Sequence, residues 1–179
     1  MDKITYEQYE QIQDEMIIDF LKNVSSKERH QLALGLNWDS NLSVLKWIVN
    51  DSATDKATAL LIYWKSAPRW RKRYAGRDEV LSECAWEIGE FDLVEETEKL
   101  FLSEFYRNHQ FSFDPANDRG IDWTAEYLDQ PVKLEIPSVM FEKLNGENVE
   151  YTESGDTKDW EEGIPPHICK KMREYEVVG

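Results

Sequence analysis

The stretch DKATALLIYWKSAP, residues 55–68, decides how this 179-residue chain is expected to fold. Its central positions are apolar apart from Thr58, and Asp55 stands where a helix N-cap is preferred. A helix that is apolar on most of its sides is normally buried among other elements. Pro68 follows, and the residue before a proline tends to leave the helical conformation. The stretch therefore predicts a buried central helix over residues 56–66.

Three shorter or more amphipathic helices are predicted before the central one. The pattern Thr5 with Gln8 is a capping box, and it precedes an apolar stripe with helical spacing over residues 4–24. Gly35 suits the end of a second helix. The remaining N-cap candidates are Ser25 or Ser26 for the second helix and Asn41 or Ser43 for the third.

Two further helices are expected after a basic connector at residues 69–77. They cover residues 78–89 and 90–108 and are separated near Gly89. From residue 111 onward, proline and glycine interrupt the chain repeatedly, so the helical pattern fades. In that region we expect a short helix over 123–128, an extended segment or short strand over 132–136, and a last helix whose first residue is Pro165 or Pro166.

These patterns predict a mainly α protein, a compact helical bundle of about six helices with an irregular acidic C-terminal region. The helical core is expected over residues 1–110, and the irregular extension over residues 111–179. We expect the extension to pack on the core, so that both form one structural unit.

Negative charge is concentrated in the second part of the chain. The formal net charge is −15, from 21 basic and 36 acidic side chains. Residues 1–77 hold 12 basic and 10 acidic side chains, whereas residues 78–179 hold 9 and 26. Such a field repels nucleic acid and anionic lipid and attracts basic surfaces. Plain solubility is the alternative explanation of the acidity.

The sequence shows no feature typical of a secreted, a membrane-bound or a metal-binding protein. The N-terminus MDKITYEQYEQ lacks the pattern of a signal peptide, no apolar run is long enough to span a bilayer, and Cys84 and Cys169 form no CxxC pair. We therefore expect a cytoplasmic protein with no cofactor. A calcium-like pattern around Asp114, Asp118 and Gly120 fails at Ala116, so we expect a turn there.

No motif predicts an enzyme. The three histidines are not spaced as metal ligands, and neither a nucleophile elbow, a P-loop nor a GxGxxG motif is present. A pair of catalytic carboxylates cannot be recognised from sequence, because it depends on a cleft that separates their pKa values. We expect no catalytic activity, and an enzyme with a carboxylate site stays an alternative.

A basic and aromatic cluster, RWRKRY at residues 69–74, has several interpretations. Basic residues interleaved with aromatic ones can hold phosphates and stack on bases. The cluster can also cap the preceding helix, line a pocket for an anionic partner, or pair with the acidic second part of the chain. The surplus of carboxylates favours internal pairing.

Three motifs resemble the bacterial family called domain of unknown function 4274. They are LNWD at 36–39, KWI at 46–48 and ATALLIYW at 57–64, and the resemblance covers about residues 32–106. It implies a helical domain without a known activity or catalytic residues. Proteins of this kind resemble those that are sometimes encoded beside polymorphic toxins.

Acidity and resemblance together predict an acidic protein-binding module. The most favoured type is an immunity or antitoxin-type inhibitor that docks on a basic toxin or nuclease-like partner, with carboxylates imitating phosphates. We expect it to bind neither nucleic acid nor membranes. Two alternatives to the inhibitor remain: the enzyme with a carboxylate site, and a scaffold protein that oligomerises through an exposed tryptophan-rich face. The predicted partner-binding residues are Glu147, Glu150, Glu153, Asp156, Asp159, Glu161 and Glu162.

Overall fold

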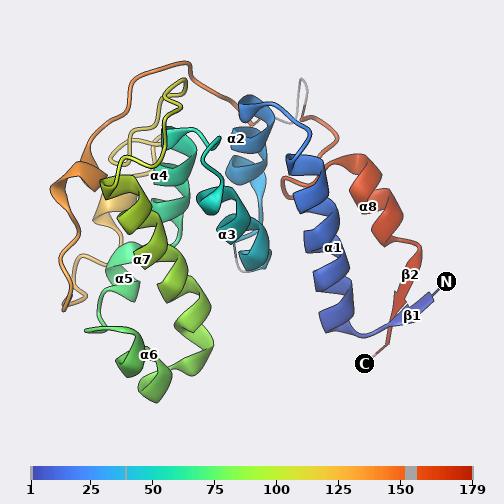
Figure 1. Cartoon of the computed structure of the whole chain (residues 1–179), viewed down its shortest axis with the longest axis horizontal. Coiled ribbons are helices and arrows are strands. Elements are labelled where there is room, and N and C mark those ends of the chain that lie inside the picture. Colours follow the sequence, from blue (N-terminus) through green and yellow to red (C-terminus); the bar gives the residue numbers. More distant parts are fainter. Residues whose placement is uncertain (1, 39, 152–156, 179) are drawn as a thin grey trace. The chain divides into compact units, whose positions relative to one another are not determined.

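The computed structural model describes residues 2–38, 40–151 and 157–178. Within these ranges it contains eight α-helices, three short 3-10 helices and one sheet of two strands (Figure 1). The predicted mainly α class is confirmed. Beyond the six helices expected before residue 111 and the predicted last helix, the basic connector contributes one short α-helix.

Two compact units divide the chain. Unit 1 contains residues 1–47 and 149–179, and unit 2 contains residues 48–148. The predicted boundary near residue 110 falls inside unit 2. The C-terminal residues therefore pack with the first helices of the chain, at a sequence separation that local patterns do not reveal.

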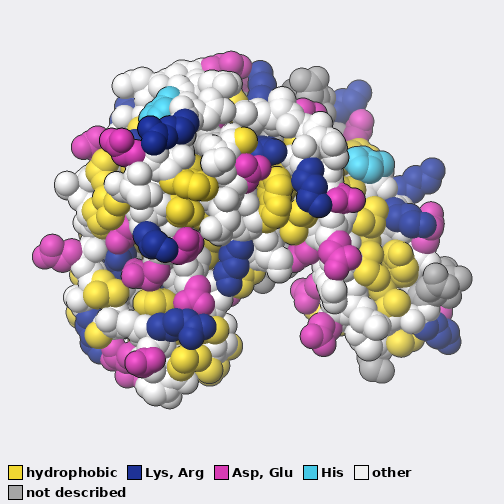
Figure 2. All heavy atoms as spheres, in the orientation of Figure 1, with side chains coloured by type: hydrophobic (Ala, Val, Ile, Leu, Met, Phe, Trp, Pro, Cys, Tyr) yellow, Lys and Arg dark blue, Asp and Glu magenta, His cyan; other side chains and the backbone are white. Residues whose placement is uncertain are grey.

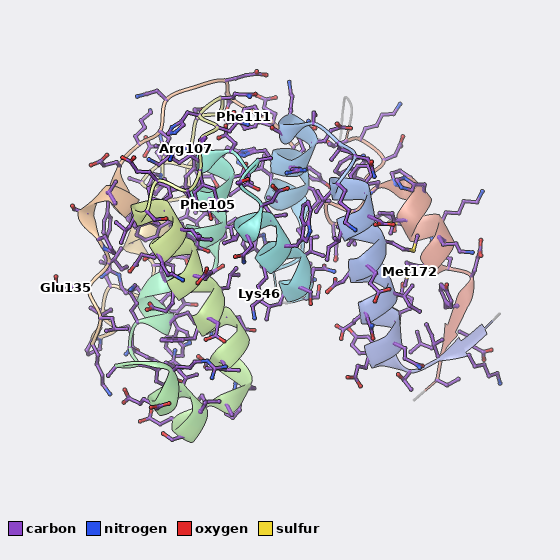
Figure 3. All side chains as sticks on the ribbon, in the orientation of Figure 1. Lys46, Phe105, Arg107, Phe111, Glu135 and Met172 are labelled. Carbon is purple, nitrogen blue, oxygen red and sulfur yellow. The ribbon has the colours of Figure 1, made fainter. Side chains whose placement is uncertain are left out.

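Unit 1 is built on two capped helices. Helix α1 (Tyr6–Leu21) begins with the predicted capping box of Thr5 and Gln8, and α2 (Ser26–Gly35) begins with a second box formed by Ser25 and Glu28. Helix α8 (Pro166–Met172) starts with the proline that the sequence predicted, and α3 (Leu42–Asn50) begins here and ends in unit 2. Fully buried side chains of these helices form the core, namely Ile17, Leu21, Leu32, Leu45, Ile168 and Met172. Figure 3 shows Met172 at the end of α8 beside α1.

The sheet of unit 1 joins the two ends of the described chain. Strand β1 (Asp2–Ile4) pairs in parallel with β2 (Tyr175–Val177). No strand was predicted at either end. The extended segment expected over residues 132–136 forms no strand in the described structure. Three-residue strands that pair across the length of the chain give no periodic signal, so the sequence could not indicate them.

Unit 2 is organised around the predicted central helix. Helix α4 (Lys56–Lys65) buries every side chain from 57 to 64, and Asp55 caps it by accepting from the Ala57 N–H at 2.9 Å. Helix α4 packs against α7 (Ile88–Leu102). The Trp64 indole donates to the Met140 carbonyl at 2.6 Å, so the irregular region after α7 is anchored to the same core.

Two predictions for the middle of unit 2 were wrong in detail. Pro68 not only follows α4 but also begins a four-residue helix, α5 (Pro68–Arg71), within the expected connector. The expected break near Gly89 lies earlier, between α6 (Arg77–Glu83) and a 3-10 turn, η1 (Ala85–Glu87). Ile88 and Phe91 on both sides of Gly89 pack on one cluster, which keeps the helix continuous.

The rest of unit 2, from residue 103 to 148, is irregular as predicted. It contains two 3-10 turns, η2 (Trp123–Ala125) and η3 (Ser138–Phe141). Isolated bridges join Phe111 with Glu147 and Phe113 with Leu144, and both phenylalanines are buried. Buried aromatic side chains therefore fix this region in place of secondary structure.

Candidate functional site

The described part of the C-terminal acidic segment, residues 149–151 and 157–164, packs closely against the end of α2. Tyr151 accepts from the Gly163 N–H at 3.2 Å and donates to the Trp160 carbonyl at 3.1 Å. A Cβ atom on Gly35 would lie 2.6 Å from the Tyr151 ring and 2.9 Å from the Gly163 Cα. Only glycine allows this approach, so residues 149–151 and 157–164, here called the acidic loop, are held in a defined position.

The predicted partner-binding residues fall into three groups. Glu150, Asp159, Glu161 and Glu162 are exposed on unit 1. Glu147 is exposed too but belongs to unit 2. Glu153 and Asp156 lie outside the described residues. The structure therefore brings only part of the predicted set together.

Contacts within unit 1 position the exposed carboxylates of the acidic loop. Glu161 forms an ion pair with Arg173 of α8 at 2.6 Å. Glu162, whose φ is +48°, accepts from the Asn37 amide at 3.4 Å. Asn37 belongs to the turn between α2 and α3, so this turn touches the acidic loop. Its neighbour Asp39, another residue of the predicted motif, lies outside the described residues.

An acidic groove runs along α1, beside the same turn. It has a volume of about 510 Å³ and contains the carboxylates of Glu7, Glu10, Asp14 and Glu15. None of its ten lining residues is lysine, arginine or histidine. Figure 2 shows acidic side chains gathered along α1. We call this feature the acidic groove.

Asn41 fixes one wall of the acidic groove. It is buried, has a φ of +56°, and donates to the Asp14 carboxylate at 2.8 Å and the Gln13 amide oxygen at 3.4 Å. Asparagine tolerates this left-handed conformation better than most residues. The α2–α3 turn thus contacts both the acidic loop, through Asn37, and the acidic groove, through Asn41.

A second hollow of about 260 Å³ lies between α1, the acidic loop and α8. Its lining includes Gln13, Glu161, Glu162 and Cys169. Burial raises the pKa of the Cys169 thiol, so this cysteine stays protonated and is not an activated nucleophile. Arg173, the ion-pair partner of Glu161, lines the hollow as well, so its charge is partly neutralised, and it holds no recognisable reactive group.

Sequence reasoning missed the acidic groove. The first 77 residues are nearly neutral in total, and this balance hides a local cluster. Glu7, Glu10 and Asp14 follow one another at spacings of three and four, which places them on one face of a helix. That spacing was the available signal.

Residues of the basic cluster at 69–74 form ion pairs with glutamates of the second part of the chain, as predicted. Lys72 is 1% exposed and lies 3.1 Å from Glu95 and 3.0 Å from Glu98 on α7. Arg71 and Arg73 both contact Glu87 at 2.8 Å. Burial opposes the ionisation of Glu87, but the hydrogen bonds and charges of the two guanidinium groups outweigh it and hold the pKa of that carboxyl below its usual value.

The calcium-like stretch is a turn, as expected. Asp118 accepts from the Trp123 indole at 2.9 Å and pairs with Arg119 at 3.0 Å, and Gly120 takes a φ of +86°. Among the described residues, no group of three or more His, Cys, Asp or Glu side chains could hold a metal ion. In the same part of the chain, no helix combines the length and the apolar character needed to cross a membrane.

Fold and surface together define a mainly helical protein with an acidic surface on unit 1. Residues 24–102 match the model of a family described as Domain of unknown function (DUF4274). This match confirms the resemblance predicted from the sequence, and it covers less than half of the chain. No curated protein and no solved structure matches the chain. The matched stretch includes the α2–α3 turn, whereas α1 and the acidic loop lie outside it.

Proposed function

We propose that this protein is an acidic binding module of the immunity or antitoxin type, which docks on a basic toxin or nuclease-like partner and covers its nucleic-acid-binding surface. One observation carries the proposal. The acidic groove holds four carboxylates, and no cationic side chain lines it. Carboxylates that are not neutralised internally are available to an external cation.

The charge of unit 1 supports this function. The unit holds 9 basic and 16 acidic side chains. A surface that binds nucleic acid is rich in lysine and arginine, and an array of carboxylates offers such a surface the charge that phosphates would offer. Long-range attraction between opposite charges also speeds association.

The proposed docking surface is formed before binding. Thr5 caps α1, Asn41 holds the groove wall, and Tyr151 holds the acidic loop on α2. Side chains on such fixed elements lose less conformational freedom on binding, which favours affinity. We place the interaction in the cytoplasm, where the free thiols of Cys84 and Cys169 stay reduced.

The first test is affinity capture from the native host's lysate at about 0.05 M and about 0.5 M salt, read by mass spectrometry. We expect one basic protein to be retained at low salt and weakened at high salt. The test variant carries Glu7→Gln, Glu10→Gln and Glu15→Gln in the acidic groove. The matched control carries Asp129→Asn, Glu135→Gln and Glu142→Gln, which are exposed on unit 2 and change the net charge equally.

The second test asks whether the captured partner is inhibited. Expression of the partner alone should stop growth of a test host, and co-expression with the wild type or the control variant should restore it. The groove variant should fail to restore growth. Restored growth with the groove variant would reject the groove as the inhibitory surface, and a captured partner without toxicity would reject the inhibitor type while leaving a binding module.

A further inference from the structure

The hollow between α1, the acidic loop and α8 has an apolar wall that the fold holds in place. Tyr9 and Gln13 line it from α1, about one helical turn apart. Ile164 of the acidic loop and Cys169 and Met172 of α8 complete this wall. Ile164 is 6% exposed and Met172 is 1% exposed, so both are fixed by packing and present only a small part of their surface to the hollow.

One carboxylate of the hollow has no cationic partner. Glu161 pairs with Arg173, which is the one cationic side chain among the lining residues. Glu162 accepts a hydrogen bond from the Asn37 amide at 3.4 Å, and it forms no ion pair with any residue that the structure describes. Two glutamates and one arginine leave the lining with one negative charge in excess.

The lysines of α8 do not change this balance. The residues of α8 that line the hollow are Cys169, Met172 and Arg173, whose spacing of three and four places them on one face of the helix. Lys170 and Lys171 are not among the lining residues, and Lys171 forms an ion pair with an exposed glutamate outside the hollow. A cation that enters the hollow therefore meets Glu162 without a lysine beside it.

The size of the hollow suits one long side chain. Its volume of about 260 Å³ lies below the range of about 300–1,000 Å³ that is typical of sites for small molecules and cofactors. Protein interfaces often place a single large side chain in such a pocket, and arginine is among the most frequent. A long cationic side chain can lay its alkyl stem on apolar surface while its charged head reaches a carboxylate.

We propose that the hollow binds an arginine side chain of the basic partner, with the guanidinium on Glu162 and the alkyl stem against Ile164 and Met172. Arginine is favoured over lysine because its guanidinium is more weakly hydrated and can form two parallel hydrogen bonds with a carboxylate. The inference rests on the proposed function for the source of the arginine. It adds a second contact site to it, because the hollow and the acidic groove share no lining residue.

Cys169 allows the hollow to be tested on the full chain without a partner. In a Cys84→Ser background, the rate at which the neutral reagent methyl methanethiosulfonate modifies Cys169 reports whether the hollow is occupied. Millimolar N-acetyl-arginine amide should slow this reaction, whereas N-acetyl-citrulline amide, which is neutral and nearly the same shape, should not. Glu162→Gln should weaken the protection about three- to tenfold. The matched control is Glu176→Gln, which is exposed on β2 and should leave the protection unchanged.

Three results with the chain alone would overturn the proposal: no protection by the arginine amide, equal protection by the citrulline amide, or unchanged protection in Glu162→Gln. The captured partner tests the source of the arginine, since Glu162→Gln should weaken its binding and Glu176→Gln should not. Unchanged binding of the Glu162→Gln variant would overturn the partner as that source. If the groove variant leaves capture unchanged while the arginine amide still protects Cys169, the proposed function fails and the arginine site stands, so the two proposals fail separately.

Discussion

The two units carry similar surpluses of negative charge but use them differently. Unit 1 holds 9 basic and 16 acidic side chains, and unit 2 holds 12 and 20. In unit 2, Arg71 at the end of α5 and the following Lys72 and Arg73 lie against carboxylates of α7 and η1, so these charges are neutralised inside the fold. In unit 1, the acidic groove has no cationic lining residue. Net charge alone therefore does not identify a docking surface, whereas the state of pairing does.

The largest effect is expected where charge is buried. Lys72→Met should lower the free energy of unfolding by about 3–5 kcal/mol, because Glu98 and the Tyr63 hydroxyl that donates to it lose their buried cation. Urea denaturation measures this loss. The matched control is Lys99→Met on α7, the helix that carries Glu98. The ion pair of Lys99 with Glu96 is exposed and contributes at most about 1 kcal/mol. Equal losses would show that the buried ion pairs of Lys72 contribute no more to stability than the exposed pair of Lys99.

The next largest effect is a difference in stability between alanine substitutions at two glycines with positive φ. Gly163→Ala in the acidic loop should cost about 2–4 kcal/mol, because its Cβ would lie 2.5 Å from the Leu36 nitrogen and the backbone is left-handed. Gly120→Ala in unit 2 meets no atom within 4 Å, so it should cost only about 1 kcal/mol of backbone strain. Thermal and urea unfolding of both variants decide this. A cost at Gly163 below about 2 kcal/mol would show that the acidic loop can move away from the end of α2 with little loss of stability.

A pH-dependent effect is expected at Glu87. Its pKa is lowered in the folded protein, so its contribution to stability is present above the usual glutamate pKa and is lost as the pH falls through the lowered value. Glu87→Gln should therefore cost about 2 kcal/mol at pH 7, and the difference from the wild type should shrink as the pH falls below the usual glutamate pKa. Urea titrations across this range measure it. A difference that is constant with pH would exclude the charge of Glu87 as its source.

The elements predicted correctly are those fixed by local chemistry. Thr5, Ser25 and Asp55 cap helices through hydrogen bonds that span two or three residues, and these patterns are visible in sequence. The buried helix α4 follows from its continuous apolar stretch. Its existence depends little on which elements cover it.

The elements that were missed depend on distant packing. Gly89 continues a helix because Ile88 and Phe91 pack on Tyr74 and Val80, which come from elsewhere in the chain. The pairing of β1 with β2 likewise joins opposite ends of the sequence. The acidic groove is hidden in the total charge of the first 77 residues, because its carboxylates form a local set on one helix.

The smallest effect on stability is expected in the acidic groove, where binding should change most. Glu7→Gln, Glu10→Gln and Glu15→Gln together should alter the free energy of unfolding by no more than about 1 kcal/mol, since no ion pair of the described residues involves these side chains. The same variant should slow association with the basic partner about tenfold at low salt and much less at high salt, as expected for electrostatic steering. Urea denaturation and stopped-flow mixing measure the two quantities. A large loss of stability would show that these carboxylates stabilise the fold, as the carboxylates paired with Lys72 do. The proposed difference between unpaired charge in unit 1 and paired charge in unit 2 would then be wrong.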